Sequence, residues 1–156
     1  MKRRPYLLFL GLGLLVATLA ATRPALATLG EAADSVTTDR KALSAAQGAT
    51  TAPRSYKIQE IVSDSTTIRE YISPNDIVFA IAWNGLTNPD LTQLLGSYAD
   101  EYNQALQKTP RKHGRRFNRV KTNRLVVEKW GHMRNLQGRA YVPNLIPPGV
   151  SIDDIK

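Results

Sequence analysis

Basic side chains are concentrated in one stretch of the chain. Residues 108–139 carry eleven Lys and Arg side chains and one acid, a net charge of +10, whereas residues 28–107 carry a net charge of −5. Clustered Lys and Arg bind phosphate and sulfate polymers by releasing counterions, with a strong dependence on salt. The alternative is a solvated loop that only keeps the protein soluble. The predicted anion-binding residues are Arg111, Lys112, Arg115, Arg116, Arg119, Lys121 and Arg124.

Two glutamates of the first predicted hairpin are a second candidate for chemistry. If the register keeps the apolar residues of both strands on one face, Glu60 lies directly opposite Glu70. Two adjacent carboxylates raise the pKa of one of them and can serve as an acid–base pair. A one-residue slip instead pairs Glu60 with Arg69 as an ordinary cross-strand ion pair, at the cost of mismatched apolar faces.

His132 is the third candidate, because it lies between Trp130 and Arg134 near a predicted turn. A histidine there could bind an anion or act as a base. A structural role is the simpler interpretation, since a zinc site would need further carboxylate ligands. The chain also has no Cys, no glycine-rich phosphate loop and no nucleophile-elbow motif. We therefore expect no cofactor and no metal.

Strands and one helix must position these residues. Residues 56–62, 68–72 and 77–83 read as an antiparallel meander, and the third run contains no polar residue, which predicts a central strand covered on both faces. Asn88, Pro89 and Asp90 form a helix start, and the apolar spacing from Leu91 to Ala105 predicts a long amphipathic helix. Strands are predicted again at 125–130 and 138–142. The order β-β-β-α-β-β predicts an α+β fold, an antiparallel sheet of about five strands with the helix packed on one face.

The first 27 residues read as a cleavable signal peptide. Lys2, Arg3 and Arg4 precede an apolar run, and Ala25-Leu26-Ala27 places small residues where a signal peptidase reads them, which predicts cleavage after Ala27. The run is shorter than a spanning helix needs, so no integral membrane span is expected after cleavage. General secretion is favoured over twin-arginine export. Cleavage would lower the net charge from +8 to +4.

The remaining chain divides into three parts. Residues 28–53 are predicted to be weakly structured, with helical spacing over part of their length. Residues 54–146 are predicted to form a single α+β domain with a basic loop at 108–121. Residues 147–156 are predicted to be a C-terminal tail lying over the surface.

Several local patterns are spread over most of the chain after residue 27. They are residues 27–30, 69–74, 78–79, 83–85, 89–91, 94–96, 131–134 and 138–143. These patterns resemble an uncharacterised family of short exported bacterial proteins, a domain of unknown function, and the block 108–124 is not part of the resemblance. The resemblance implies an exported protein and assigns no catalytic residue.

These observations favour a periplasmic or secreted non-enzymatic interaction protein. Its partners would be anionic envelope polymers or lipid headgroups bound by the basic loop, or another protein recruited through a sheet edge or the Pro-rich tail. The alternative is a small periplasmic hydrolase-like enzyme that uses Glu60, Glu70 or His132.

Overall fold

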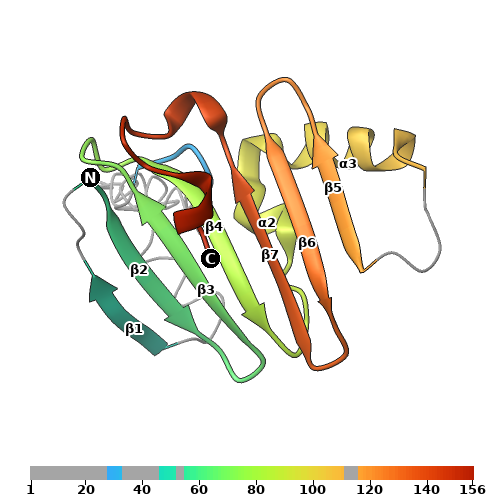
Figure 1. The fold of residues 1–156 in the computed structure, drawn as a ribbon, viewed down its shortest axis with the longest axis horizontal. Coiled ribbons are helices and arrows are strands. Elements are labelled where there is room, and N and C mark those ends of the chain that lie inside the picture. Colours follow the sequence, from blue (N-terminus) through green and yellow to red (C-terminus); the bar gives the residue numbers. More distant parts are fainter. Residues whose placement is uncertain (1–27, 33–45, 52–54, 111–115) are drawn as a thin grey trace, which may run out of the picture.

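The computed structural model describes residues 28–32, 46–51, 55–110 and 116–156. These residues form a seven-stranded antiparallel sheet with strand order β1-β2-β3-β4-β7-β6-β5 (Figure 1). After β4 the chain passes through its helices to the far edge and returns strand by strand, so that β7 pairs with β4. The strands are β1 (Ala46–Thr51), β2 (Lys57–Val62), β3 (Thr66–Ile72), β4 (Val78–Gly85), β5 (Phe117–Lys121), β6 (Val126–His132) and β7 (Asn135–Tyr141).

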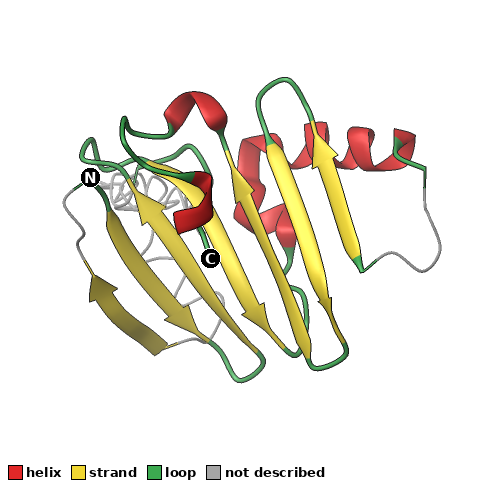
Figure 2. Ribbon diagram, viewed as in Figure 1, coloured by secondary structure: helices red, strands yellow, loops and turns green. Residues whose placement is uncertain are grey.

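Helices cover one face of this sheet, called here the inner face (Figure 2). They are α2 (Leu91–Leu95), the 3₁₀ helix η2 (Gly96–Tyr98) and α3 (Ala99–Lys108). The predicted α+β class is therefore confirmed, and the predicted meander and last two strands are present with ends shifted by a few residues. The count of about five strands is too low, because β1 and β5 form the two edges of the sheet.

Strand β5 corrects the prediction of a basic loop at 108–121. Its residues alternate, and only Val120 is buried against the inner-face core, while the other four are exposed. An edge strand with one inward apolar residue carries almost no alternating hydrophobic signal. The predicted loop is therefore shorter, and its residues 111–115 lie outside the described part of the chain.

The helical segment also differs in detail from the prediction. Asp90, not Asn88, caps helix α2, with its carboxylate accepting a hydrogen bond from the Thr92 N–H at 2.9 Å. Gly96 then interrupts the helix with φ +47°, a conformation that favours glycine. A Cβ at Gly96 would lie 2.5 Å from the Thr28 Cβ, so the N-terminal residues pack where the helix breaks.

Residues 28–32 belong to the folded core, contrary to the prediction that 28–53 is weakly structured. Leu29 is fully buried between α2 and β4, and its N–H donates to the Leu94 carbonyl at 3.1 Å. Gly30 donates to the Val78 carbonyl at 2.8 Å, and Val78 donates back to Glu31 at 3.0 Å. The helix predicted within 28–53 falls largely on residues 33–45, which lie outside the described residues.

The C-terminal segment packs on the second face of the sheet, called here the outer face, and is not a surface tail. It contains the 3₁₀ helices η3 (Pro143–Leu145) and η4 (Ile152–Asp154), continues from the end of β7, and lies in front of β3 and β4 in Figure 1. Ile155 is 1% exposed and joins a cluster with Tyr71, Phe79 and Tyr141. Strand β4 is buried on both faces for this reason, as its uninterrupted apolar sequence predicts.

Candidate functional site

Three rows of side chains cross the outer face, because paired residues of neighbouring strands point to the same side. The first, the apolar row, consists of Ile58, Tyr71, Ala80, Tyr141, Val126 and Lys121. The second, the charged row, consists of Glu60, Arg69, Ala82, Arg139, Glu128 and Arg119. The third, the polar-aromatic row, consists of Val62, Thr67, Asn84, Gln137, Trp130 and Phe117.

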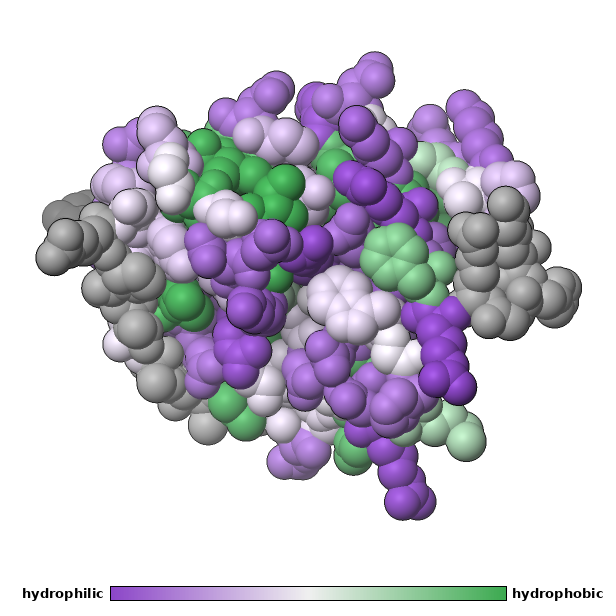
Figure 3. Space-filling view, viewed as in Figure 1, coloured by the Kyte–Doolittle hydropathy of each residue, from purple (hydrophilic) through white to green (hydrophobic). Residues whose placement is uncertain are grey.

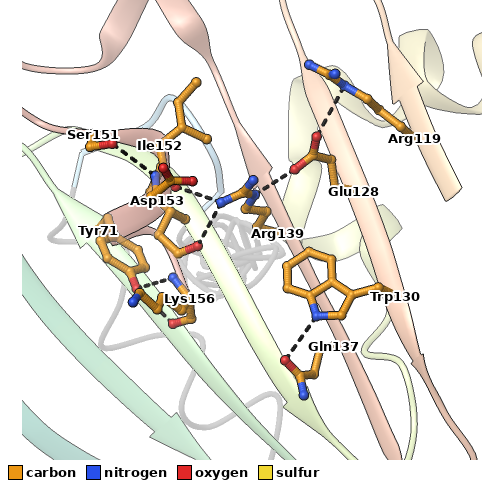
Figure 4. A network of polar contacts seen from close by, with 11 residues as sticks. Tyr71, Arg119, Glu128, Trp130, Gln137, Arg139, Ser151, Ile152, Asp153 and Lys156 are labelled. Atoms are coloured by element: carbon orange, nitrogen blue, oxygen red, sulfur yellow. Dashed lines mark hydrogen bonds and ion pairs between the residues drawn. The ribbon is translucent and has the colours of Figure 1, made fainter. Parts of the chain in front are cut away.

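Apart from the exposed Lys121 at its β5 end, the apolar row lies beneath the C-terminal segment. The Tyr71 hydroxyl donates to the Lys156 backbone oxygen and accepts from the Lys156 N–H, both at 2.9 Å (Figure 4). Burial raises the pKa of Tyr71 above its usual value, because the charged phenolate is poorly solvated there. The neutral hydroxyl therefore serves as both donor and acceptor in fastening the end of the chain.

The charged row is the border of the covered area. Glu128, which is 5% exposed, lies between Arg139, with Nε 2.7 Å from Oε2, and Arg119, with Nε 3.2 Å from Oε1 (Figure 4). Arg139 also donates through Nη1 to the Ile152 carbonyl at 2.7 Å. At the other end of the row, Arg69 pairs with Glu60 at 2.7 Å. The guanidinium groups of Arg69 and Arg139 hold the sheet and the C-terminal segment together, because each bonds a carboxylate of the sheet and a backbone oxygen of that segment.

The polar-aromatic row lies beyond this border. The indole N–H of Trp130 donates to Gln137 Oε1 at 3.1 Å. Gln137 Nε2 in turn donates to Asn135 Oδ1 at 2.8 Å, and Asn84 Nδ2 donates to the same oxygen at 3.3 Å. Phe117 is directly opposite Trp130 and is 47% exposed. Two aromatic rings and a chain of linked amides therefore share one open stretch of sheet.

The structure separates the predicted anion-binding residues into two groups. Arg124 bonds Glu101 at 2.7 Å and stacks over the Tyr98 ring at 5.0 Å, so it fastens the β5–β6 turn to the helices. Arg119 is held by Glu128 in the charged row. Arg116 and Lys121 are exposed, and within the described part of the chain no carboxylate lies at ion-pair distance from either. Arg111, Lys112 and Arg115 fall outside the described residues.

The Arg124 contact also affects its acidic partner. A hydrogen bond with the Thr122 side chain and, after it, the Arg124 guanidinium lower the pKa of Glu101, because both stabilise its carboxylate. This effect belongs to the junction of α3 with the sheet and has no connection with the outer face.

The structure does not bring the three catalytic candidates together. The β2–β3 register pairs Glu60 with Arg69 and Gln59 with Glu70, so the two glutamates lie on opposite faces. His132 is exposed at the end of β6, which is separated from β3 by β4 and β7. The register expected from matched apolar faces is wrong because both faces bury apolar residues: Ile61 packs inward and Ile58 packs under the C-terminal segment.

Among the residues that the structure describes, no group of three or more Asp, Glu or His side chains is arranged to hold a metal ion. None of the described helices combines the length and the apolar character needed to cross a bilayer.

Sequence reasoning missed the polar-aromatic row. In the sequence, Trp130 is considered only as a neighbour of His132, and Phe117 falls within the basic loop predicted at 108–121. The one sign of a strand in the sequence is that Phe117, Arg119 and Lys121 occupy every second position, with the inward Val120 between the last two. That pattern is typical of a strand with one exposed functional face, but it is short enough to be lost among the surrounding charges.

The fold and its outer face define a small α+β domain, with helices on one face of an antiparallel sheet and a partly open second face. The chain belongs to the family described as "Protein of unknown function (DUF2844)", whose model matches residues 25–155. The resemblance to an uncharacterised family is thereby confirmed, and the match includes both the N-terminal residues in the core and the C-terminal segment. Neither a curated protein nor a solved structure matches the chain.

Proposed function

We propose that this chain is an exported, non-enzymatic interaction protein that binds anionic polymers at the β5 edge of its sheet. The proposal of export rests on the charged, apolar and small-residue pattern of residues 1–27. The predicted cleavage site directly precedes Thr28, which is 7% exposed and is followed by the fully buried Leu29. Processing after Ala27 would thus remove the signal peptide without cutting into the core.

One observation carries the proposal of anion binding: the positive charge of residues 108–139 lies on the same edge of the sheet as the exposed ring of Phe117 and the half-buried ring of Trp130. Arg116 directly precedes Phe117, the first residue of β5, and Lys121 is the last residue of that strand; both are exposed to solvent. The single negative charge of Glu128 is shared between the two positive charges of Arg119 and Arg139. This end of the charged row therefore keeps a net positive charge. A polyanion lying along this edge would release counterions, so its binding weakens as salt increases.

The three residues named for the enzymatic alternative do not form one site within the described part of the chain. Glu60 is bonded to Arg69 at 2.7 Å, and Glu70 lies in the inner-face core. His132 lies on a third strand, near the turn where its Nδ1 is 3.1 Å from the Met133 carbonyl oxygen. A general acid–base pair needs its members within hydrogen-bond reach of one substrate, and these three residues do not meet that condition.

The test uses protein purified from cells that express the full chain. Mass spectrometry gives its first residue, which we expect to be Thr28. Binding to immobilised dextran sulfate is then measured at low and high salt. The variant Arg116→Gln/Lys121→Gln should lose about tenfold in affinity at low salt and show a shallower salt dependence.

A matched control removes the same charge elsewhere. Lys57→Gln/Lys156→Gln also loses two exposed positive charges, on the β2 and C-terminal side of the molecule. It should bind like the unmodified protein. Equal losses in both double variants would show that net charge alone attracts the polymer, and no binding at low salt would refute the proposal. A retained segment 1–27 would refute cleavage.

A further inference from the structure

We infer that the polar-aromatic row is a binding site for the sugar rings of an acidic polysaccharide. This inference rests on the proposed function, because it names the class of polymer that the β5 edge would bind. It assigns the charge recognition to Arg116 and Lys121, and the recognition of sugar rings to Phe117, Trp130 and the neighbouring amides.

The C-terminal segment leaves this row open. Its backbone is fastened to the sheet by Tyr71 in the apolar row and by Arg69 and Arg139 in the charged row. Within the described residues, none of its hydrogen bonds reaches the polar-aromatic row. Figure 3 views the same face, and over β5 to β7 it shows pale and weakly hydrophobic side chains surrounded by hydrophilic ones.

Trp130 supplies a flat and fixed surface for stacking. In Figure 4 its fused rings appear face on, so one face of the indole points away from the sheet. The bond to Gln137 holds the ring in place, and the Arg139 guanidinium lies 5.7 Å from the ring centroid. The face of an aromatic ring is electronegative and attracts the weakly positive C–H groups of a pyranose. Phe117 extends this surface by one strand, about 5 Å away.

The amides beside the rings match the hydroxyl groups of a sugar. Asn135 Oδ1 accepts from both Gln137 and Asn84, which orients the two NH₂ groups. Each NH₂ group has a second N–H to donate, and the Asn84 side-chain oxygen adds an acceptor at an exposed position. Alternating donors and acceptors next to a stacking surface give both orientation and selectivity for a polyhydroxylated ring.

The charge around the row favours an acidic polysaccharide over a nucleic acid. Arg119 and Arg139 are committed to Glu128, and Arg124 is committed to Glu101. Arg116, directly before Phe117, remains exposed beside the row, and Lys121 remains exposed at the other end of β5, where a polymer lying along the strand would reach it. A single-stranded nucleic acid presents a phosphate at every nucleotide and is held by many cations along its backbone, whereas this row offers few cations and many uncharged polar groups.

The experiment compares two carboxylate polymers that differ in their rings. Polygalacturonate carries its carboxylates on pyranose rings, whereas polyglutamate carries them on flexible side chains. At equal carboxylate concentration, the protein should bind polygalacturonate at least fivefold more tightly. Trp fluorescence should change with polygalacturonate only, and it reports on Trp130 because Trp83, the second tryptophan, is 2% exposed in the inner-face core.

Variants locate the effect. Trp130→Ala and Phe117→Ser should each reduce the affinity for polygalacturonate to that for polyglutamate while leaving polyglutamate binding unchanged. Ile152→Ser, which changes a 40%-exposed apolar residue on the C-terminal segment, away from the row, should alter neither affinity. Thermal unfolding checks that each variant is folded, and the fluorescence of the unmodified protein tests the inference without any substitution.

The outcomes separate this inference from the proposed function. Equal binding of both polymers, with no effect of Trp130→Ala, would refute the sugar site and leave anion binding intact. Failure to bind any polyanion, dextran sulfate included, would overturn both. Tighter binding of a thymidine oligonucleotide than of polygalacturonate, lost in Trp130→Ala, would show that the row is a nucleic-acid surface and would refute the sugar assignment.

Discussion

Leu29 offers the sharpest test of the fold, because it is only the second residue after the predicted cleavage site. Its side chain is fully buried between α2 and β4, and its N–H is bonded to Leu94. Leu29→Ala removes three buried carbons and leaves a cavity that a helix and a sheet cannot easily close. Substitutions of this kind cost about 2–5 kcal/mol, and we expect about 3 kcal/mol here.

Urea unfolding followed by far-UV circular dichroism measures this change. A loss of about 3 kcal/mol should also lower the melting temperature by about 10 °C in a domain of this size. Leu86→Ala is the control, since Leu86 is 56% exposed and its truncation should cost less than about 0.5 kcal/mol. A Leu29→Ala protein as stable as this control would show that residues 28–32 do not belong to the cooperative core.

The remaining predictions concern two groups with shifted pKa values. Burial raises the pKa of Tyr71, so the stability that its neutral hydroxyl contributes is present below about pH 10 and is lost as pH rises through its folded pKa. The urea midpoint should therefore drop less between neutral and alkaline pH in Tyr71→Phe than in the unmodified protein. The hydrogen bond with Thr122 and the Arg124 guanidinium lower the pKa of Glu101. The contribution of the Glu101 carboxylate to the free energy of unfolding is therefore present above the unfolded-state pKa and is lost as pH falls through the folded-state pKa. Glu101→Gln should cost about 0.5 kcal/mol at neutral pH and nothing in acid, and an equal loss at both pH values in urea titrations would contradict the ion pair as its cause.

The central part of the fold could be predicted from the sequence because its signals are local. Strand β4 is an unbroken apolar run, and the helical repeat from Leu91 onward has the spacing of a buried stripe. Such patterns reflect burial of side chains that are close in sequence. The helix interruption at Gly96 could not be predicted in this way, because its cause is Thr28, almost seventy residues earlier in the chain.

The outer face could not be predicted for the same reason. Its coverage by the C-terminal segment depends on bonds between residues more than eighty positions apart, such as Tyr71 with Lys156. Without that coverage, the sequence favours a register that places every apolar residue of the first hairpin on one face. With it, Ile58 can be buried on the outer face, Glu60 meets Arg69, and the hypothesis of a glutamate pair fails.

The three rows differ in what their side chains contribute to stability, and this difference is the argument for function in the third. The apolar row is buried under the C-terminal segment, and the charged row bonds that segment to the sheet. In contrast, Phe117 is 47% exposed and gains little from burial. Phe117→Ser should therefore cost less than about 1 kcal/mol, unlike Leu29→Ala. The exposed Phe117 ring contributes little to the fold and is available to contact a ligand beside the half-buried Trp130, and a large loss of stability in Phe117→Ser would instead assign Phe117 to the core.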